Sequence, residues 1–261
     1  MSEEAAQATE GAAKTRPAAE KDPVVMAIDV GGSHVKILTS AGGDIRRTPS
    51  GTAMTAPQMI AAVKELAKDI DFDVVSMGYP GPVLHNRPLL EPANLGPGWV
   101  GCDFAAGFGK PVKIVNDALM QAIGSYEGGR MLFLGLGTGL GAAMIVGNVA
   151  QPMELAHLPY KKRTYEGYVG ARALEEFGKK AWRRHVEDVV ECLVAALQPD
   201  DVVLGGGNAK KLKELPPLCR LGENANAFKG GFRMWEGPLT EKSARSRKQT
   251  AHAATARWQE R

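Results

Sequence analysis

The sequence has little cysteine, few aromatic residues and no long apolar run. Its 261 residues include three cysteines, Cys102, Cys192 and Cys219, which lie far apart and form no CxxC pair. They therefore supply neither a disulfide framework nor a cysteine metal site, which is typical of a reducing compartment and predicts a cytoplasmic protein. No stretch approaches the roughly 20 apolar residues that a membrane-spanning helix needs, so we expect no membrane partner. A basic and then apolar secretion leader is also missing.

The body of the chain has almost no excess of either positive or negative charge. The net charge is +3, and residues 241–261 carry six Lys and Arg against two Glu, whereas residues 1–23 carry five acidic and three basic groups. The basic excess is thus a property of the tail and predicts no nucleic-acid partner for the fold. Residues 1–23 also have almost no large apolar side chain, so we expect a disordered leader there and a disordered tail over 241–261.

Short apolar runs alternate with helical periodicity over the rest of the chain. Strands are predicted at 24–30, 34–40, 74–78, 112–115, 131–136, 142–146 and 202–204. The spacing of apolar residues predicts a helix over 57–70, with Thr55 near its start. A second, longer helix is predicted over 167–197, with a break near Gly178.

This alternation is typical of an α/β protein with two lobes. Each half opens with a strand, a glycine turn and a second strand. We therefore predict an N-terminal lobe over residues 24–120, a C-terminal lobe over 121–240, and an active site in the cleft between them.

Three glycine-rich turns, each after an apolar strand, are the first strong indication of function. The first, at 29–36, combines a carboxylate, two glycines, a hydroxyl and a lysine, and the others lie at 136–141 and 204–208. Glycine lets backbone N–H groups approach an anion closely, and a serine hydroxyl adds a donor. Asp29, at a strand end, could hold hydrated Mg²⁺ against phosphates. Each turn alone could equally be ordinary chain reversal, because glycine turns are common.

Two other glycine motifs are missing from the sequence. There is no GxxxxGK[ST] pattern, which excludes a P-loop, and no GxGxxG pattern opens a helix after the first strand. Phosphoryl transfer therefore fits the sequence better than hydride transfer.

A second group of polar side chains lies on turns beside glycine and proline. Its members are Asn94, Asn116, Asp117, Glu154, His157 and Glu166. Such groups suit sugar hydroxyls, each of which presents a donor and an acceptor, and Asp117 could be a general base for a hydroxyl nucleophile. The ordinary alternatives are a helix N-cap for Asn116 or Asp117 and a surface charge for Glu166. Glu154 and His157 alone are too few for a metal site.

These motifs occur in the order found in ROK-family sugar kinases. The resemblance rests on residues 29–36, 78–82, 93–95, 98–99, 115–118, 136–141, 154–157 and 204–207. Over about residues 24–232 the chain resembles the polyphosphate glucokinases of this family. The resemblance implies the two-lobed actin/hexokinase-like (ribonuclease H-like) kinase fold and phosphorylation of the 6-hydroxyl of glucose.

The resemblance also implies a role for each matching residue. Asp117 resembles the catalytic base and a sugar ligand. The other implied sugar ligands are Asn94, Asn116, Glu154, His157 and Glu166. The implied phosphate ligands are Asp29, Gly31, Gly32, Ser33 and Lys36 in the first turn, and Gly137, Thr138 and Gly139 in the second. Gly205, Gly206 and Gly207 resemble the loop beside adenosine in the ATP-using relatives.

The chain departs from many ROK members in three places. Many carry a cysteine-rich zinc loop soon after the histidine, whereas no cysteine lies between His157 and Cys192 here. Residues 158–168 instead resemble the zinc-free polyphosphate branch, so we predict that the protein holds no zinc. The 23-residue leader is too short and polar for the helix-turn-helix of ROK repressors. Residues 222–231 lack the usual sequence of the family's last helix.

The expected phosphoryl donor is polyphosphate, ATP or both, used with Mg²⁺. Two basic clusters could form a track for a polyanion, and ordinary surface charge is the alternative for each. They are residues 161–163 and the group Lys210, Lys211 and Lys213. The relatives suggest a homodimer.

Two functions of other classes stay open at this point. One is a sugar-binding or regulatory protein that has lost phosphoryl transfer, although intact Asp29, Lys36 and Asp117 argue against it. The other is a polyanion-binding module that uses the basic tail at 241–261, with the folded part as a scaffold.

Overall fold

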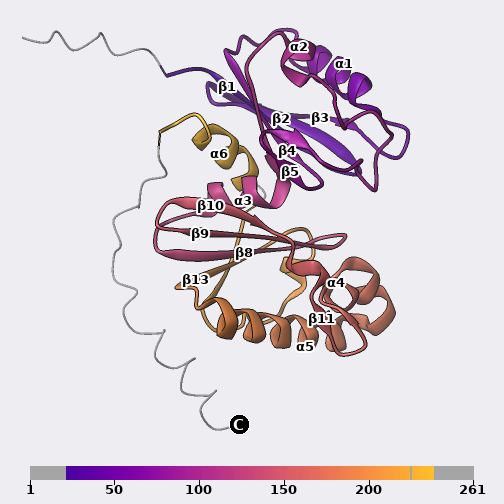
Figure 1. Cartoon of the computed structure of the whole chain (residues 1–261), viewed down its shortest axis with the longest axis vertical. Helices are drawn as coiled ribbons and strands as arrows, with labels where there is room; N and C mark the ends of the chain where they lie inside the picture. The colour runs from indigo at the N-terminus through magenta and orange to yellow at the C-terminus, as the bar shows by residue number, and fades with distance from the viewer. Residues whose placement is uncertain (1–21, 224, 238–261) are drawn as a thin grey trace, which may run out of the picture.

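The structure is a computed structural model that describes residues 22–223 and 225–237 (Figure 1). It contains two five-stranded sheets, with two helices packed between them. The predicted α/β architecture with two lobes is confirmed. The predictions for the tail and for residues 1–21 of the leader lie outside the described residues. No helix in the described ranges is both long and apolar enough to cross a membrane.

The first sheet combines an antiparallel hairpin with two parallel strands. Across the sheet lie β3 (Gly42–Pro49), β2 (His34–Thr39), β1 (Val25–Val30), β4 (Val74–Tyr79) and β7 (Val112–Asn116). β1 pairs antiparallel with β2 and parallel with β4, which pairs parallel with β7. Two helices, α1 (Ala56–Leu66) and α2 (Phe104–Phe108), share one apolar core with this sheet. A short hairpin, β5 (Val83–Leu84) and β6 (Arg87–Pro88), follows β4.

The start of α1 shows how local sequence fixes this lobe. Thr55 is the N-cap: its hydroxyl accepts a hydrogen bond from Gln58 N, and Gln58 Oε1 accepts one from Thr55 N at 2.9 Å. Pro57 occupies the first turn, where its missing N–H is not needed. The predicted helix is therefore confirmed at its start, but it ends at Leu66 rather than at residue 70.

The second sheet repeats this plan. Across it lie β10 (Val149–Met153), β9 (Leu140–Val146), β8 (Arg130–Leu136), β13 (Asp201–Gly205) and β14 (Cys219–Leu221). The long helix α5 (Ala171–Leu197) packs its apolar face, including Trp182 and Leu193, into the core of this lobe. The predicted break is confirmed at Gly178, whose φ of 72° interrupts the helix.

Short elements connect β10 to α5. They are the 3-10 turn η1 (Leu155–His157), the hairpin of β11 (Pro159–Tyr160) and β12 (Arg163–Thr164), and the helix α4 (Glu166–Val169). A second 3-10 turn, η2 (Ala209–Lys211), follows β13. Several predicted site residues therefore lie on short elements at the edge of the second lobe.

Two helices, α3 (Asp117–Ser125) and α6 (Asn226–Arg233), pack against each other between the sheets (Figure 1). Gly124 of α3 faces the carbonyl of Asn226, and Gly230 of α6 faces the carbonyl of Met120, so the two backbones are in direct contact. Glycine allows this close approach because it carries no side chain.

Helix α6 returns to the first sheet. It packs against β1 and β4, although residues 121–240 were predicted to form the C-terminal lobe. The buried Ser76 hydroxyl donates a 2.6 Å hydrogen bond to Gly231 O and accepts one from Trp235 Nε1 at 2.9 Å. The predicted division at residue 120 falls inside α3, and the two lobe ranges stay a prediction.

Candidate active site

The parallel strands of the first sheet bring acidic groups together at their carboxyl ends. Asp29 of β1 lies opposite Gly78 of β4, which lies opposite Val115 of β7. Asp117 follows directly after β7, and a Cβ atom on Gly78 would lie 3.4 Å from Asp117 Cα. The sheet register therefore places Asp29 and Asp117 at one edge, on either side of a glycine.

Asp117 is the first residue of α3 and is partly buried. Its pKa is raised to about 7, chiefly by burial and then by the negative charge of Asp29, with a smaller contribution from Glu154. The Ala118 N–H, which donates to Asp117 Oδ1 at 2.7 Å, acts in the opposite direction. A carboxylate with a pKa near 7 is well matched to take a proton from a hydroxyl group at neutral pH.

The raised pKa predicts that Asp117 destabilises the folded protein above neutral pH. The folded state keeps the proton up to about pH 7, whereas the unfolded carboxyl loses it near 3.8, so the free energy of unfolding falls as pH rises between these values. We expect the Asp117→Asn variant to match the unmodified protein at about pH 4 and to exceed it at pH 8 by up to about 4 kcal/mol, the full effect of a pKa of about 7 against 3.8, or by up to roughly 8–16 °C in Tm. Thermal unfolding of both proteins in EDTA from pH 4 to 8 checks this. A Tm difference that does not change with pH would contradict it.

The first glycine turn joins β1 to β2 and carries a paired lysine. Lys36 Nζ donates to Asp29 Oδ2 at 3.1 Å, because the hairpin register places these residues opposite each other. Gly31 N bonds His34 O at 3.0 Å, so this segment is also an ordinary hairpin turn. A Cβ atom on Gly32 would lie 3.0 Å from the Cβ atom of Asn94. The structure therefore brings the predicted sugar ligand Asn94 against the first predicted phosphate turn, where Ser33 is exposed.

The second glycine turn, between β8 and β9, lies close to the start of α3. A Cβ atom on Gly141 would lie 2.8 Å from the Cβ atom of Ala118, next to Asp117. Thr138 O accepts a 3.1 Å hydrogen bond from Ala171 N, which ties the turn to α5.

Glu166 contacts this second turn. Its Oε2 accepts a 3.3 Å hydrogen bond from Leu140 N and lies where a side chain on Gly139 would stand. Glu166 is exposed, which agrees with the alternative of an ordinary surface charge, but its carboxylate also binds the backbone of the second glycine turn. Its predicted role as a sugar ligand stays a prediction.

The third glycine turn packs on the second. β8 and β13 are parallel, with Gly205 opposite Gly135, so both turns leave the same edge of the second sheet. Asn208 N donates to Leu136 O at 2.9 Å, and Asn208 Nδ2 donates to Gly137 O at 3.1 Å. Gly206 has a φ of 80° and faces Leu136 O, which leaves little space for a side chain. Gly207 is exposed.

Asn208 is a site residue to which the sequence analysis gave no role. The signal available was its position directly after three glycines, since an asparagine amide readily bonds the backbone of a turn. Its contact with Gly137 crosses 71 residues of sequence, and the sequence pattern does not reveal such a contact.

Asn116 fulfils the alternative role considered for it. It is the N-cap of α3: its Oδ1 accepts hydrogen bonds from Ala118 N at 2.9 Å and Leu119 N at 3.3 Å. Its Nδ2 donates to Gly81 O at 3.1 Å. The amide thus fixes the direction in which α3 and Asp117 leave the sheet, and its sugar contact stays a prediction.

Glu154 directly precedes the 3-10 turn η1, His157 is the last residue of that turn, and both are exposed. Glu154 is near enough to Asp117 for its charge to raise the pKa of that carboxyl. Within the described residues, no hydrogen bond or ion pair connects His157 to the other predicted site residues. The structure therefore places Glu154 close to Asp117, but it shows no contact that links His157 to the same group.

The environment of Asp29 fits a hydrated Mg²⁺ ion. Mg²⁺ keeps several waters and uses one or two carboxylates together with substrate phosphates. Asp29 has 18% of its side chain exposed and lies beside the carboxylate of Asp117, so it could hold such an ion through water. In the described residues, no group of three or more His, Cys, Asp or Glu could hold a metal ion.

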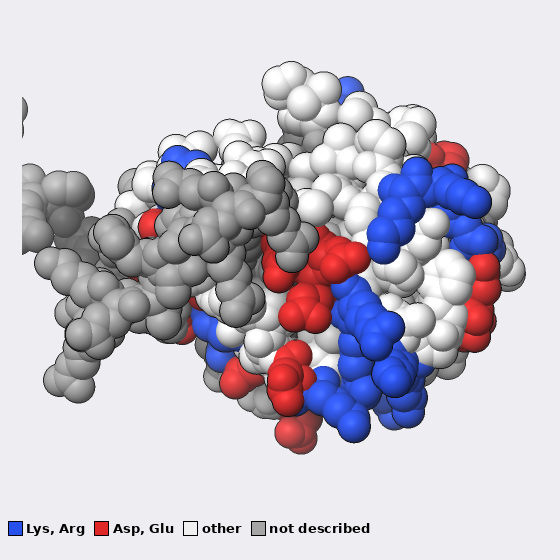
Figure 2. All heavy atoms as spheres, turned by 90° about the horizontal axis from the view of Figure 1, so that it is seen from below, with Lys and Arg blue, Asp and Glu red and all other residues white. Residues whose placement is uncertain are grey.

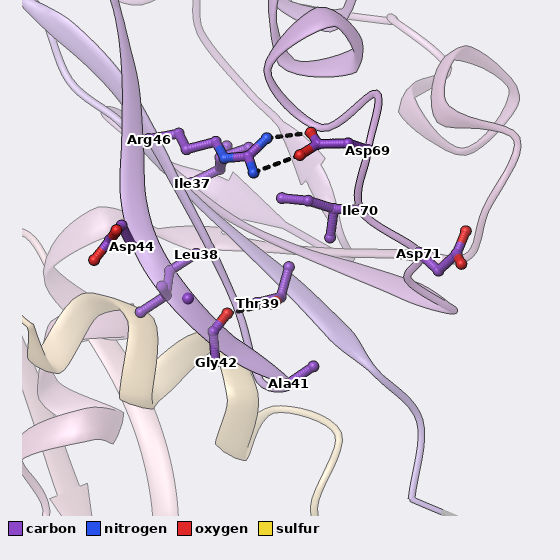
Figure 3. A pocket seen from close by; sticks show the side chains of 11 residues that line it. Ile37, Leu38, Thr39, Ala41, Gly42, Asp44, Arg46, Asp69, Ile70 and Asp71 are labelled. Carbon is purple, nitrogen blue, oxygen red and sulfur yellow. Dashed lines mark hydrogen bonds and ion pairs between the residues drawn. The ribbon is translucent and has the colours of Figure 1, made fainter.

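A cavity of about 280 Å³ lies elsewhere, between the β2–β3 hairpin and the segment after α1 (Figure 3). Arg46 forms a bidentate ion pair with Asp69 in its wall, with Nη2 2.8 Å from Oδ2. None of the predicted site residues lines this cavity. It therefore gives no support to the proposed chemistry.

The two sheets, the helices between them and the acidic strand ends beside glycine turns define a two-lobed protein of the actin/hexokinase-like kinase fold. A polyphosphate/ATP-glucomannokinase from Arthrobacter sp. strain KM has a similar structure, with a TM-score of 0.72 and 22% identity. The similarity covers 82% of this chain and 98% of that one. The predicted fold class is thus confirmed.

Residues 25–152 match the model of the ROK family. The chain is 26% identical over 214 residues to the polyphosphate glucokinase of Mycobacterium leprae, a match that covers 74% of this chain and 62% of that protein. With the polyphosphate glucokinase of Mycobacterium tuberculosis (strain H37Rv), the identity is 26% over 213 residues, 73% of this chain and 80% of that one. The chain thus matches less than two thirds of the length of the first of these relatives. The predicted resemblance is confirmed.

Proposed function

We propose that this protein is a sugar kinase that transfers a phosphoryl group from polyphosphate, ATP or both to the 6-hydroxyl of glucose. The observation that carries the proposal is the position of Asp117, a partly buried carboxylate with a pKa of about 7, between Asp29 and the second glycine turn. The similarity to polyphosphate glucokinases supports the sugar and the donor.

On the sugar side, Asn94, Asn116, Glu154, His157 and Glu166 would bind hydroxyl groups of the hexose. Asp117 would accept the proton of the 6-hydroxyl as its oxygen attacks the terminal phosphorus of the donor. The new P–O bond forms while the bond from phosphorus to the bridging oxygen of the donor breaks, and the shortened donor leaves. Asp117 then releases the proton to solvent.

On the phosphate side, the protein has mainly to position the donor and neutralise its charge. The backbone N–H groups of Gly31, Gly32 and Gly137–139, with the Ser33 and Thr138 hydroxyls, would bind phosphate oxygens. Lys36 would contribute a positive charge, which its contact with Asp29 holds at the strand end. Mg²⁺, held through water by Asp29, would supply further charge neutralisation. Residues 205–207 would lie beside the donor because they pack on the second turn.

A coupled assay of glucose 6-phosphate formation tests the proposal. With Mg²⁺ and glucose, we expect turnover with polyphosphate, with ATP or with both, and the parallel assays identify the donor. A parallel measurement of Tm with and without glucose reports sugar binding independently of transfer. If neither donor supports turnover but glucose still raises Tm, the kinase proposal is contradicted and a sugar-binding or regulatory protein is favoured.

The homodimer, the cytoplasmic location and the lack of zinc stay predictions. The alternative function as a polyanion-binding module depends on residues 241–261, which lie outside the described residues. If the kinase proposal is correct, deleting that segment should leave sugar phosphorylation intact.

A further inference from the structure

The structure distinguishes the two basic clusters near the proposed site. In the first, residues 161–163, Lys161 Nζ lies 3.2 Å from Asp188 Oδ2, and Arg163 forms two 2.7 Å bonds to Glu176. Both partners belong to α5. These side chains therefore attach the β11–β12 hairpin to the helix, and much of their charge is already compensated.

The second cluster extends onto α5 and forms what we call the basic face. It comprises Lys179, Lys180, Arg183, Arg184, Lys210, Lys211 and Lys213. All are exposed except Arg183, which is partly buried. In the described part of the chain, none of these seven has a carboxylate oxygen within 4.0 Å of its charged nitrogen atoms. Figure 2 views the molecule from the side on which α5 lies in Figure 1, and it shows two groups of Lys and Arg with Asp and Glu beside them.

A series of hydrogen bonds connects the basic face to the second glycine turn. Arg183 Nε donates to Lys211 O at 2.7 Å, and Lys211 Nζ donates to Asn208 Oδ1 at 2.7 Å. Asn208 Nδ2 in turn donates to Gly137 O at 3.1 Å. The uncompensated charges therefore start beside the proposed transfer site and continue outward along α5.

We propose that the basic face binds the distal, non-transferred phosphates of a polyphosphate donor whose terminal group lies at the second glycine turn. This inference rests on the proposed kinase function and specifies the path along which the polyphosphate donor leaves the transfer site. The chain of phosphates leaves the site over the third glycine turn toward Lys210 and α5. It does not run along the β11–β12 hairpin, because Lys161 and Arg163 are ion-paired there.

The size and composition of the basic face favour polyphosphate over other anions. ATP offers three phosphates and then a nucleoside, so it has no charge to place on α5, where the basic residues 179–184 extend over about 8 Å of helix. Polyphosphate carries charge along its whole length. Proteins that bind single-stranded nucleic acid add exposed aromatic side chains on which bases stack. The aromatic residue within 179–184 is Trp182, which is buried in the core of the second lobe and offers no such surface.

The test removes charge without disturbing contacts. We use a triple variant, Lys180→Gln, Arg184→Gln and Lys210→Gln, because these exposed side chains make no hydrogen bond or ion pair within the described residues. We expect KM for long-chain polyphosphate to rise at least about tenfold, and the slope of log affinity against log salt to fall by about 2, since each contact to a flexible polyanion contributes about 0.7. KM for ATP and for glucose should not change.

A matched control removes the same charge from the first lobe through Lys64→Gln, Arg87→Gln and Lys110→Gln. These three side chains are exposed and make no hydrogen bond or ion pair within the described residues. An equal KM for polyphosphate in the two triple variants would overturn the proposal. Equal weakening of single-stranded DNA binding and polyphosphate binding by the basic-face variant would also overturn it, by making the face a nucleic-acid surface. Filter binding of labelled polyphosphate gives the same comparison without turnover, so failure of the kinase proposal remains distinguishable.

Discussion

The Asp117→Asn variant is expected to lose about 10²–10⁴-fold in kcat while it keeps most of its affinity for glucose. Asparagine preserves the size of the side chain and its position at the start of α3, but it cannot take the proton of the attacking hydroxyl. In the unmodified protein, kcat/KM should rise with pH up to about 7, where Asp117 loses its proton, and then level off. Turnover is measured across this pH range for both proteins.

The control for this prediction is Asp44→Asn, which removes an exposed carboxylate from β3 in the same lobe. Its turnover and pH profile should match those of the unmodified protein. A normal rate in Asp117→Asn would show that another group takes the proton. A lost glucose-induced rise in Tm would instead show that Asp117 acts mainly in sugar binding.

Replacing Gly124 or Gly230 by alanine is expected to lower the free energy of unfolding by about 3 kcal/mol or more. A methyl group on Gly124 would meet the carbonyl of Asn226, and one on Gly230 would meet that of Met120. Neither obstacle is the end of a flexible side chain, so α3 and α6 would have to separate. Alanine's better helix propensity recovers only about 1 kcal/mol. We expect Tm to fall by about 6–12 °C, as measured by calorimetry.

Gly237→Ala is the matched control. Among the described residues, no atom lies within 4 Å of the position that its Cβ would occupy, and its φ is outside the left-handed region. This change should leave Tm unchanged or raise it slightly, because alanine restricts the unfolded chain. An unchanged Tm in the Gly124 and Gly230 variants would mean that the two helices are not in backbone contact.

Buried strands were the part of the fold that the sequence predicted best. Strands such as β1, β4 and β8 are apolar on both faces, and such runs stand out in the sequence. The edge strands β3 and β10 were missed because neither contains a fully buried residue; β3 is also largely polar, and Gln151 and Pro152 interrupt the apolar residues of β10. Helix α6 was also missed: Gly230 and Gly231 make its sequence a weak helix former, and their function becomes visible only in the contact with α3 and β1.

The candidate site was predictable where topology alone brings residues together. Asp29 and Asp117 meet because Asp29 lies near the carboxyl end of β1 and Asp117 directly follows β7, and both strands run parallel to β4, so these ends share one edge of the sheet. Contacts such as Glu166 with Leu140 N, or Asn208 with Gly137 O, depend on how separate segments pack. Single motifs do not encode such contacts. The sequence also could not separate the two possible roles of Asn116, because a helix N-cap and a sugar ligand would both use an asparagine at this position.

The return of α6 to the first sheet has a consequence for the order of folding during synthesis. Ser76 and its partner Gly231 are separated by 155 residues, so the hydroxyl stays without this acceptor until the end of the described chain has been made. At about 5–20 residues per second, the ribosome needs roughly 6–20 s after β7 to deliver α6. During that interval Ala27 and Ser76, which Gly231 contacts, await this helix. The lobe that is translated first is therefore the one that is completed last.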